Sequence, residues 1–326
     1  MQTVCTKEPY KVSIGVPVFG VEKYIERCAR SLFEQTYNNL EYVFVNDCTK
    51  DSSIAILKKI LEDYPERQKQ VKILNHEKNQ GLGGARNTAV SNASGSFLLW
   101  VDADDYVDVQ LIKKVVDKQI ENDADIVSFD YFEDYGDNNI KKIRSNYLKE
   151  TELWKKDVVS RVEPTMVWRR LFRISLYREN LIEVKLGVNM GEDYQVVPKL
   201  FYYAQRIDGL NDCLYYYNKA NISSYCASYN ISKAEQSIQS AFIVKQFFRN
   251  KGYVLKNAAD IALAKTIAMQ VRGCINASKR EYYKKLKRRM NSFSRAIIEQ
   301  LPIRDRLMFS VKNYTIWRLV CILFRR

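Results

Sequence analysis

Short apolar runs alternate with helix-like segments through roughly the first 135 residues of this 326-residue chain. The runs are rich in Val, Ile and Phe, as buried strands are, and the segments between them carry apolar residues at helical spacing. Strands that alternate with helices predict βαβ units and a mostly parallel, Rossmann-like sheet flanked by helices, an α/β fold. The expected strands cover 11–19, 41–47, 71–76, 96–102 and 125–132, and the expected helices cover 23–36, a segment capped by Asp51, 85–93 and 109–121.

The alternation ends near residue 135. A polar turn at 136–139 leads into a mixed segment with many aromatic residues, which runs to about residue 225. From about Ser232 the chain is helix-like and basic. We therefore predict two domains, residues 1–230 and a helical extension at 231–326, with a further division of the first domain near residue 135.

Composition excludes several classes of protein. No apolar run reaches the roughly 18 to 20 residues that a membrane-spanning helix needs. The first residues, "MQTVCTKEPYK", contain no hydrophobic signal core, so we expect a cytoplasmic protein. The seven cysteines include no CxxC pair, which indicates reduced thiols. The only histidine, His76, gives little to build a zinc site or a histidine-based triad.

The net charge of +14 is unevenly distributed. Residues Lys245 to Arg326 contain 20 basic and 4 acidic residues, a net charge of +16, which leaves −2 for the rest of the chain. Segments 282–301 and 306–326 mix basic with large apolar residues, a composition that suits the surface of an anionic membrane. The alternative is a packed helical subdomain with a solvated basic face. Nucleic acid is a weaker candidate partner, because no recognition motif is present.

An acidic cluster follows the fourth expected strand. In "FLLWVDADDYVD" (97–108) an apolar run leads directly into Asp102, Asp104 and Asp105. In open α/β sheets, ligands bind at the carboxyl ends of the strands, where Asp47 also lies. Carboxylates bind a diphosphate only through a bridging Mg²⁺ or Mn²⁺, which prefers oxygen ligands. The cluster therefore predicts a metal–diphosphate site, with a solvated acidic turn as the alternative.

A glycine-rich stretch, "NQGLGGARN" (79–87), lies upstream. Its glycines, Gly81, Gly83 and Gly84, allow the backbone to approach a ligand closely. Arg86 opens the next expected helix, where an anion is favoured. A plain glycine-rich turn remains the alternative.

Taken together, these motifs resemble those of the family 2 glycosyltransferases. The resemblance implies a GT-A fold over residues 1–230, with a nucleotide half near 1–135 and an acceptor half near 136–230. It also implies inverting transfer from a UDP-sugar, Mn²⁺ or Mg²⁺ as cofactor, a glycan or lipid-linked acceptor, and polysaccharide synthesis at the inner face of the cell membrane. The matching stretches are "PVFGVEKYIERCARSLFEQTY" (17–37), "NDCTKDSS" (46–53), "NQGLGGARN", "DADD" (102–105) and "GEDYQVVPKLF" (191–201).

The resemblance also implies roles for individual residues. Asp193 would be the catalytic base, Asp104 and Asp102 would bind the metal, and Asp105 would support them. The nucleotide would contact Pro17, Phe19, Glu22, Asp47, Gly83, Arg86 and Asp102, with Phe19 against the base and Asp47 accepting a hydrogen bond from it.

Three positions depart from the family pattern, and two other functional classes stay open. Gly20 stands where the family has Asn, Asn46 replaces an Asp and Cys48 replaces a Gly. A sugar-phosphate nucleotidyltransferase also joins metal-binding carboxylates to a Rossmann-like sheet, although its glycine-rich loop is expected directly after the first strand. A nucleic-acid-binding protein with an inactive enzyme body is the second alternative.

Overall fold

The computed structural model describes residues 10–147, 150–221 and 229–310. These residues form two compact units. The first unit contains Met1–Thr151, Met166–Gly187 and Leu200–Ile222, and the second contains Glu152–Thr165, Val188–Lys199 and Ser223–Arg326. Segments from the middle of the chain thus belong to the unit that holds the C-terminal helices. The domain boundary predicted near residue 230 stays a prediction, because a compact unit is not necessarily a domain that folds alone.

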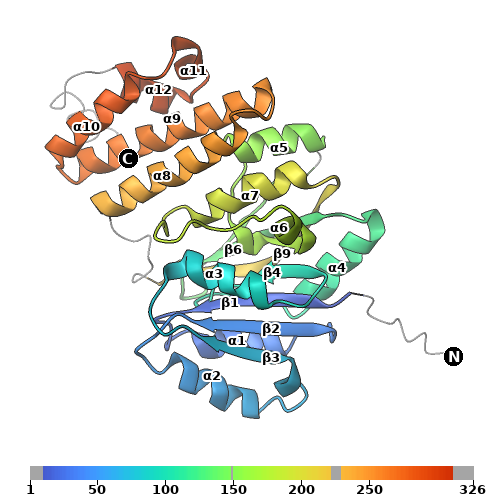
Figure 1. Cartoon of the computed structure of the whole chain (residues 1–326). Coiled ribbons are helices and arrows are strands. Elements are labelled where there is room, and N and C mark those ends of the chain that lie inside the picture. Colours follow the sequence, from blue (N-terminus) through green and yellow to red (C-terminus); the bar gives the residue numbers. More distant parts are fainter. Residues whose placement is uncertain (1–9, 148–149, 222–228, 311–326) are drawn as a thin grey trace. The chain divides into compact units, whose positions relative to one another are not determined.

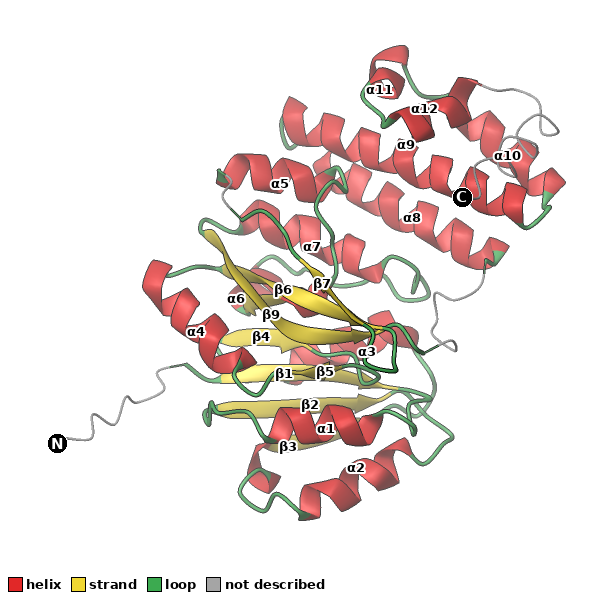
Figure 2. Ribbon diagram, turned by 180° about the vertical axis from the view of Figure 1, so that it is seen from behind, coloured by secondary structure: helices red, strands yellow, loops and turns green. Residues whose placement is uncertain are grey.

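The first unit is built on one mixed sheet with the strand order β3-β2-β1-β4-β8-β6-β9-β5, and β7 pairs with β6 (Figure 2). All five predicted strands are present as β1, β2, β3, β4 and β6. The strands are β1 (Val12–Val18), β2 (Leu40–Asn46), β3 (Val71–Asn75), β4 (Phe97–Trp100), β5 (Tyr106–Val107), β6 (Ile126–Asp134), β7 (Ile140–Ile143), β8 (Arg170–Arg173) and β9 (Ile207–Asn218).

The predicted parallel pairing is found throughout β3-β2-β1-β4 and again between β6 and β9, whereas β8, β7 and β5 pair antiparallel with their neighbours. The first four strands in this order pair in parallel. Beyond them, β8 inserts between β4 and β6 and pairs antiparallel with both. β8 comes from residues 170–173, far along the chain from both partners, so the local alternation of strands and helices does not predict it.

The helices of the first unit follow the predicted pattern, with two differences at their starts (Figure 1). α3 begins at Gly81, so the glycines lie inside the helix and not in a turn before it. α2 begins at Ser53, and Asp51 accepts the amide of Ser53 from just outside the helix, one residue before the N-cap position. The helices are α1 (Ile25–Phe33), α2 (Ser53–Glu62), α3 (Gly81–Asn92), α4 (Leu111–Asn122) and α6 (Ser175–Glu179), with short 3₁₀ turns η1 (Gln68–Gln70) and η2 (Val167–Arg169). α7 (Glu192–Tyr203) contributes residues to both units.

The second unit is helical and has α9 (Tyr253–Asn276) at its centre. α8 (Ile231–Phe248) lies beside α9 in both views, and α10 (Arg280–Met290), α11 (Arg295–Glu299) and α12 (Ile303–Ser310) also pack against α9 (Figures 1 and 2). α5 (Thr151–Val159) completes the described helices. No helix in the described ranges is long and apolar enough to cross a membrane.

Most of the apolar residues of segment 282–301, which was predicted to bind a membrane, are buried against other helices of this unit. Tyr282, Tyr283, Leu286 and Met290 of α10 are buried. Further along, Ile297 and Leu301 join a cluster with Ile261 and Ala264 of α9. Of the two predicted alternatives, a membrane-binding surface or a packed helical subdomain, the structure shows the packed helical subdomain for residues 282–310. Residues 311–326, most of the second predicted segment (306–326), lie outside the described part of the chain.

One buried carboxylate joins the amino ends of the four parallel strands. Glu41 of β2 accepts hydrogen bonds from the Ser13 hydroxyl of β1 at 2.6 Å and from the amide and hydroxyl of Ser94, just before β4, at 2.6 and 2.8 Å. Lys72 of β3 forms an ion pair with it at 2.6 Å. Burial alone would raise the pKa of Glu41, but these bonds outweigh it and lower the pKa to about 2.

This carboxylate makes stability depend on pH. The pKa of Glu41 is lower in the folded chain than the roughly 4.3 of an unfolded one, so its contribution is complete above about pH 5 and is lost as the pH falls toward 2. We expect Glu41→Gln to lower the free energy of unfolding at neutral pH. The deficit should shrink by on the order of 3 kcal/mol between pH 5 and 2, measured by urea unfolding. Glu62→Gln, an exposed substitution on α2, serves as the control, and an equal deficit for Glu41→Gln at both pH values would contradict the assignment.

Candidate active site

The loops that follow β1 and β2 bind each other at the carboxyl edge of the parallel strands. The amide of Gly20 donates to Thr49 Oγ1 at 2.9 Å. Glu22 and the second loop are joined reciprocally, because the amide of Glu22 donates to Asp51 Oδ2 at 3.0 Å and Glu22 Oε2 accepts the amide of Ser52 at 3.1 Å. The carboxylate of Glu22 therefore stabilises the contact between the two loops. Its contact with a nucleotide stays a prediction.

Two of the departures from the family pattern lie where the backbone has positive φ. Gly20 has φ of 68° and Cys48 has φ of 61°. Gly and Asn tolerate this conformation best, so Gly20 and the family's Asn meet the same requirement, whereas Cys48 adopts it at a cost. The third departure, Asn46, accepts the amide of Thr49 and donates to the Asn75 side chain, which fixes the loop after β2.

An aromatic ring is exposed at the end of β1. Phe19 is 55% exposed and directly follows the last strand residue, Val18. An exposed aromatic ring at this edge has an apolar face available for stacking. Pro17, the other residue predicted here, lies within β1 opposite Val45 of β2.

Asp47 holds the start of α3. Its carboxylate accepts the amides of Gln80 at 2.7 Å and Gly81 at 2.8 Å, and His76 Nδ1 lies 2.7 Å from Oδ1. The other ring nitrogen of His76 is 2.9 Å from Thr88 Oγ1, so the histidine has a structural role. A carboxylate can accept about four hydrogen bonds, so three partners leave Asp47 one acceptor position, on a side chain that is only 4% exposed. Its predicted bond to a nucleotide base stays a prediction.

Arg86 links α3 to the acidic cluster. Its guanidinium is buried and donates to Asp102 Oδ1 at 3.1 Å, while it lies 5.7 Å from the ring of Trp100. Gly83 is buried one turn earlier in the same helix. The structure therefore brings the arginine and the first aspartate together, as expected for one site.

The three aspartates of the DADD turn have different environments. Asp102 is partly exposed beside Arg86. Burial, together with the charge of Asp102, raises the pKa of Asp104, and Asp104 Oδ2 accepts a hydrogen bond from Asn221 at 2.8 Å. Asp105 is fully buried, and burial together with its two acidic neighbours raises its pKa well above the usual value. The cluster is therefore not a solvated acidic turn.

β9 supplies the groups that hold this turn. The Tyr215 hydroxyl donates to Asp105 Oδ2 at 2.6 Å and accepts the amide of Asp102 at 3.1 Å. The amide of Asn218 donates to Asp105 Oδ1 at 2.8 Å. The ring of Tyr215 stacks on Trp168 with centroids 4.4 Å apart. The sequence offers Tyr215 only as one of several tyrosines that could border an acceptor. Its contact with Asp105 is not predictable from a local pattern, because the two residues lie 110 positions apart in the chain.

The donor set fits a metal that is shared with a phosphate ligand. Among the described residues, no group of three or more His, Cys, Asp or Glu side chains is arranged to hold a metal ion. Mg²⁺ and similar hard cations often take only one or two protein carboxylates and complete their shell with phosphates and water. Asp102 and Asp104 suit that role, and Mn²⁺ or Mg²⁺ stays a prediction.

The predicted base, Asp193, lies in the first turn of α7 and belongs to the second unit. Glu192 precedes it in the same turn and is buried, whereas Asp193 is partly exposed. Acidic residues are favoured at a helix start by the helix dipole in any case. The catalytic role of Asp193 therefore stays a prediction.

Comparison with known proteins identifies relatives over most of this region. The family model described as glycosyl transferase family 2 matches residues 13–184. Glycosyltransferase GlyA of Streptococcus pneumoniae is 30% identical over 218 residues, which cover 64% of this chain and 30% of that protein. The poly(ribitol-phosphate) beta-N-acetylglucosaminyltransferase TarS of Staphylococcus aureus is 28% identical over 225 residues, which cover 68% of this chain and 38% of TarS. The matches thus span well under two thirds of these relatives' own length.

Solved structures of TarS share the fold. TarS 1–349 in complex with UDP-GlcNAc matches with a TM-score of 0.72 and 21% identity, over 97% of this chain and 91% of that one. The complex of TarS 1–349 with UDP matches with a TM-score of 0.70. The GT-A fold and the helical C-terminal region expected from the sequence are therefore confirmed.

The contact between Tyr215 and Asp105 can be tested by removing one hydroxyl. We expect Tyr215→Phe to lower the free energy of unfolding by about 1 to 3 kcal/mol, because a buried carboxyl group loses its partner. Urea unfolding measures the change. Tyr216→Phe is the matched control, since Tyr216 contributes ring stacking on Tyr106 and Phe132 and its hydroxyl has no hydrogen-bond partner among the described residues. Equal effects of the two substitutions would contradict the role given to Tyr215.

Proposed function

Because this chain belongs to glycosyl transferase family 2, we propose that it transfers a sugar from a UDP-sugar to a hydroxyl group of a glycan or a lipid-linked acceptor, with inversion at the anomeric carbon. The observation that carries the proposal is the pairing of Asp102 with Arg86 and the presence of Asp104 at the carboxyl edge of the parallel strands. Ligands of open α/β sheets bind at this edge. The family match favours this function over a nucleotidyltransferase or a nucleic-acid-binding protein.

Three features of the first unit support a nucleoside diphosphate donor. Phe19 offers an exposed ring for a base, and Asp47 keeps one acceptor position on a carboxylate that is already oriented by α3. Asp102 and Asp104 would supply oxygen ligands for a divalent cation, which would offset the charge of the diphosphate. UDP and UDP-GlcNAc are the ligands in the matching TarS structures, which supports uridine as the base.

The chemistry requires a base and a stabilised leaving group. The acceptor hydroxyl must lose its proton as it attacks the anomeric carbon, and a carboxylate such as that of Asp193 is suited to accept it. A divalent cation, when bound, neutralises charge on the departing diphosphate. Arg86 keeps Asp102 oriented through a charge-assisted hydrogen bond of 3.1 Å, and Tyr215 keeps the turn that carries both aspartates in place.

We place the reaction at the surface of an anionic membrane, in the assembly of a cell-surface polysaccharide. The net charge of +16 between Lys245 and Arg326 supports attraction to such a surface. The relatives support the class of product, because TarS is named as a transferase that acts on poly(ribitol-phosphate).

The donor and metal assignments have one common test. In a thermal-shift screen of UDP-, GDP- and dTDP-sugars, we expect a UDP-sugar with Mn²⁺ to raise the melting temperature most, because a ligand stabilises the state that binds it. Asp104→Ala should remove the Mn²⁺-dependent part of this shift and lower transfer by at least roughly 10³-fold. Asp108→Ala, four residues further along, is the control and should keep both. Unchanged metal-dependent binding of UDP by Asp104→Ala in calorimetry would overturn the metal assignment.

The base has a separate test. Asp193→Asn keeps the shape of the side chain but cannot accept a proton, so we expect turnover to fall by roughly 10²- to 10⁴-fold. UDP-sugar affinity, measured by calorimetry, should change little. Glu192→Gln is the matched control in the same helical turn. If Glu192→Gln abolishes turnover and Asp193→Asn leaves it intact, the base is Glu192.

A further inference from the structure

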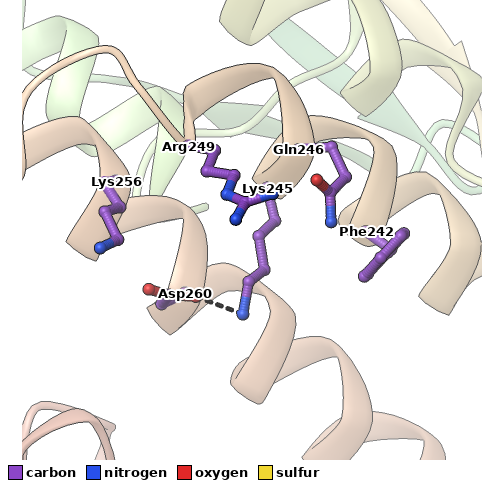
Figure 3. A pocket seen from close by; sticks show the side chains of 6 residues that line it. All are labelled: Phe242, Lys245, Gln246, Arg249, Lys256 and Asp260. Carbon is purple, nitrogen blue, oxygen red and sulfur yellow. Dashed lines mark ion pairs between the residues drawn. The ribbon is translucent and has the colours of Figure 1, made fainter.

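The turn between α8 and α9 carries a basic hollow in the second unit. The hollow has a volume of about 340 Å³ and lies between the end of α8 and the start of α9 (Figure 3). Figure 3 shows Lys245 of α8 reaching toward Asp260 of α9, to which it pairs at 2.6 Å. The lining residues are Phe242, Lys245, Gln246, Arg249, Lys256 and Asp260.

The hollow contains more cationic than anionic side chains. Asp260 is its only carboxylate and is already paired with Lys245. Arg249 and Lys256 are exposed, and neither has an acidic partner within the described part of the chain. Residues 245 to 256 contain four basic residues and no acidic one. An anionic group that enters the hollow would therefore meet two cations that nothing else in the described chain neutralises.

Exposed apolar side chains border these cations. Gly252, with φ of 84°, turns the chain into α9, whose first residues, Tyr253 and Val254, are 80% and 58% exposed. Tyr253 lies one turn before Lys256 and so on the same side of the helix. Phe242 is 48% exposed and lines the hollow itself. Exposed apolar side chains beside cations suit contact with a partner that is both apolar and anionic.

We propose that this α8–α9 turn is the surface through which the protein docks on an anionic phospholipid membrane. Arg249 and Lys256 would bind lipid phosphates, and Tyr253 and Val254 would enter the boundary between headgroups and acyl chains, where an aromatic ring with a polar end is favoured. A soluble anionic polymer would use the cations alone and would leave Tyr253 and Val254 without a role. The apolar component therefore favours the bilayer.

The strongly basic helix α10 is a poorer candidate for the same task. Lys285 and Arg289 form ion pairs with Glu235 at 3.0 and 2.9 Å, and Lys287 donates to the carbonyl oxygen of Met308 at 2.8 Å. The apolar face of α10 is buried in the second unit. The inference rests on the proposed membrane-associated function and assigns it to a different segment from the one that composition alone suggests.

The test is cosedimentation of the full chain with vesicles, without donor or acceptor, so that a failure of the proposed transfer reaction leaves the result interpretable. The vesicles contain phosphatidylcholine alone or an equal mixture with phosphatidylglycerol. We expect binding to the mixed vesicles only. Arg249→Gln/Lys256→Gln should weaken the partition coefficient by roughly 25-fold, because each basic residue near an anionic surface contributes about fivefold. Tyr253→Ser/Val254→Ser should weaken it by at least about fivefold and leave its dependence on salt unchanged.

Matched controls separate this surface from net charge. Arg280→Gln/Arg288→Gln removes two exposed cations from α10, which begins beyond the far end of the 24-residue α9, and should lower binding by no more than about twofold, because exposed charges beyond a Debye length are screened. All four side chains of the test variants are exposed, so circular dichroism and the thermal transition should be unchanged. Equal losses in the control and the test variants would overturn the proposal. So would full retention of binding by Tyr253→Ser/Val254→Ser together with competition by soluble polyphosphate, which would identify an anionic polymer as the ligand.

Discussion

The buried carboxyl group of Asp105 is the constraint around which the candidate site is organised. A carboxyl group without a cationic partner is expensive to bury, and it is tolerated only where hydrogen bonds replace those it made to water. Tyr215 and Asn218, both on β9, provide these bonds. The hydroxyl of Tyr215 also accepts a hydrogen bond from the amide of Asp102. The position of β9 therefore fixes the turn that contains Asp102 and Asp104. Formation of the site therefore depends on a strand from the second half of the chain.

The loops after β1 and β2 and the start of α3 are also held by hydrogen bonds, here to backbone amides that would otherwise lack acceptors. The start of α3 leaves amides that require acceptors, and Asp47 satisfies those of Gln80 and Gly81. The loops after β1 and β2 satisfy each other through the reciprocal bonds of Glu22 and its partners. These hydrogen bonds hold the loops in place by contacts within the chain itself.

The second unit shows that the number of charges and their availability are different properties. The sequence places most of the positive charge after residue 245. In the structure, Lys285 and Arg289 are occupied by Glu235, whereas Arg249 and Lys256 stay exposed beside Tyr253. Attraction to an anionic surface depends on the cations that remain accessible. The proposed docking turn between α8 and α9 therefore relies on its exposed cations and not on the net charge of the whole segment.

The sequence by itself determined five of the strands and four of the helices within the first 135 residues, because hydrophobic periodicity is a local property, and strand-end residues indicated the edge at which the candidate site is proposed. It also predicted that Arg86 lies near the acidic cluster, and the structure joins Arg86 to Asp102 by a hydrogen bond. Only the tertiary structure decided that β8 inserts antiparallel next to β4, that Tyr215 holds Asp105, and that the apolar face of α10 is buried. Each of these depends on contacts between residues far apart in the chain, and the free energy of such contacts is not encoded in any local pattern.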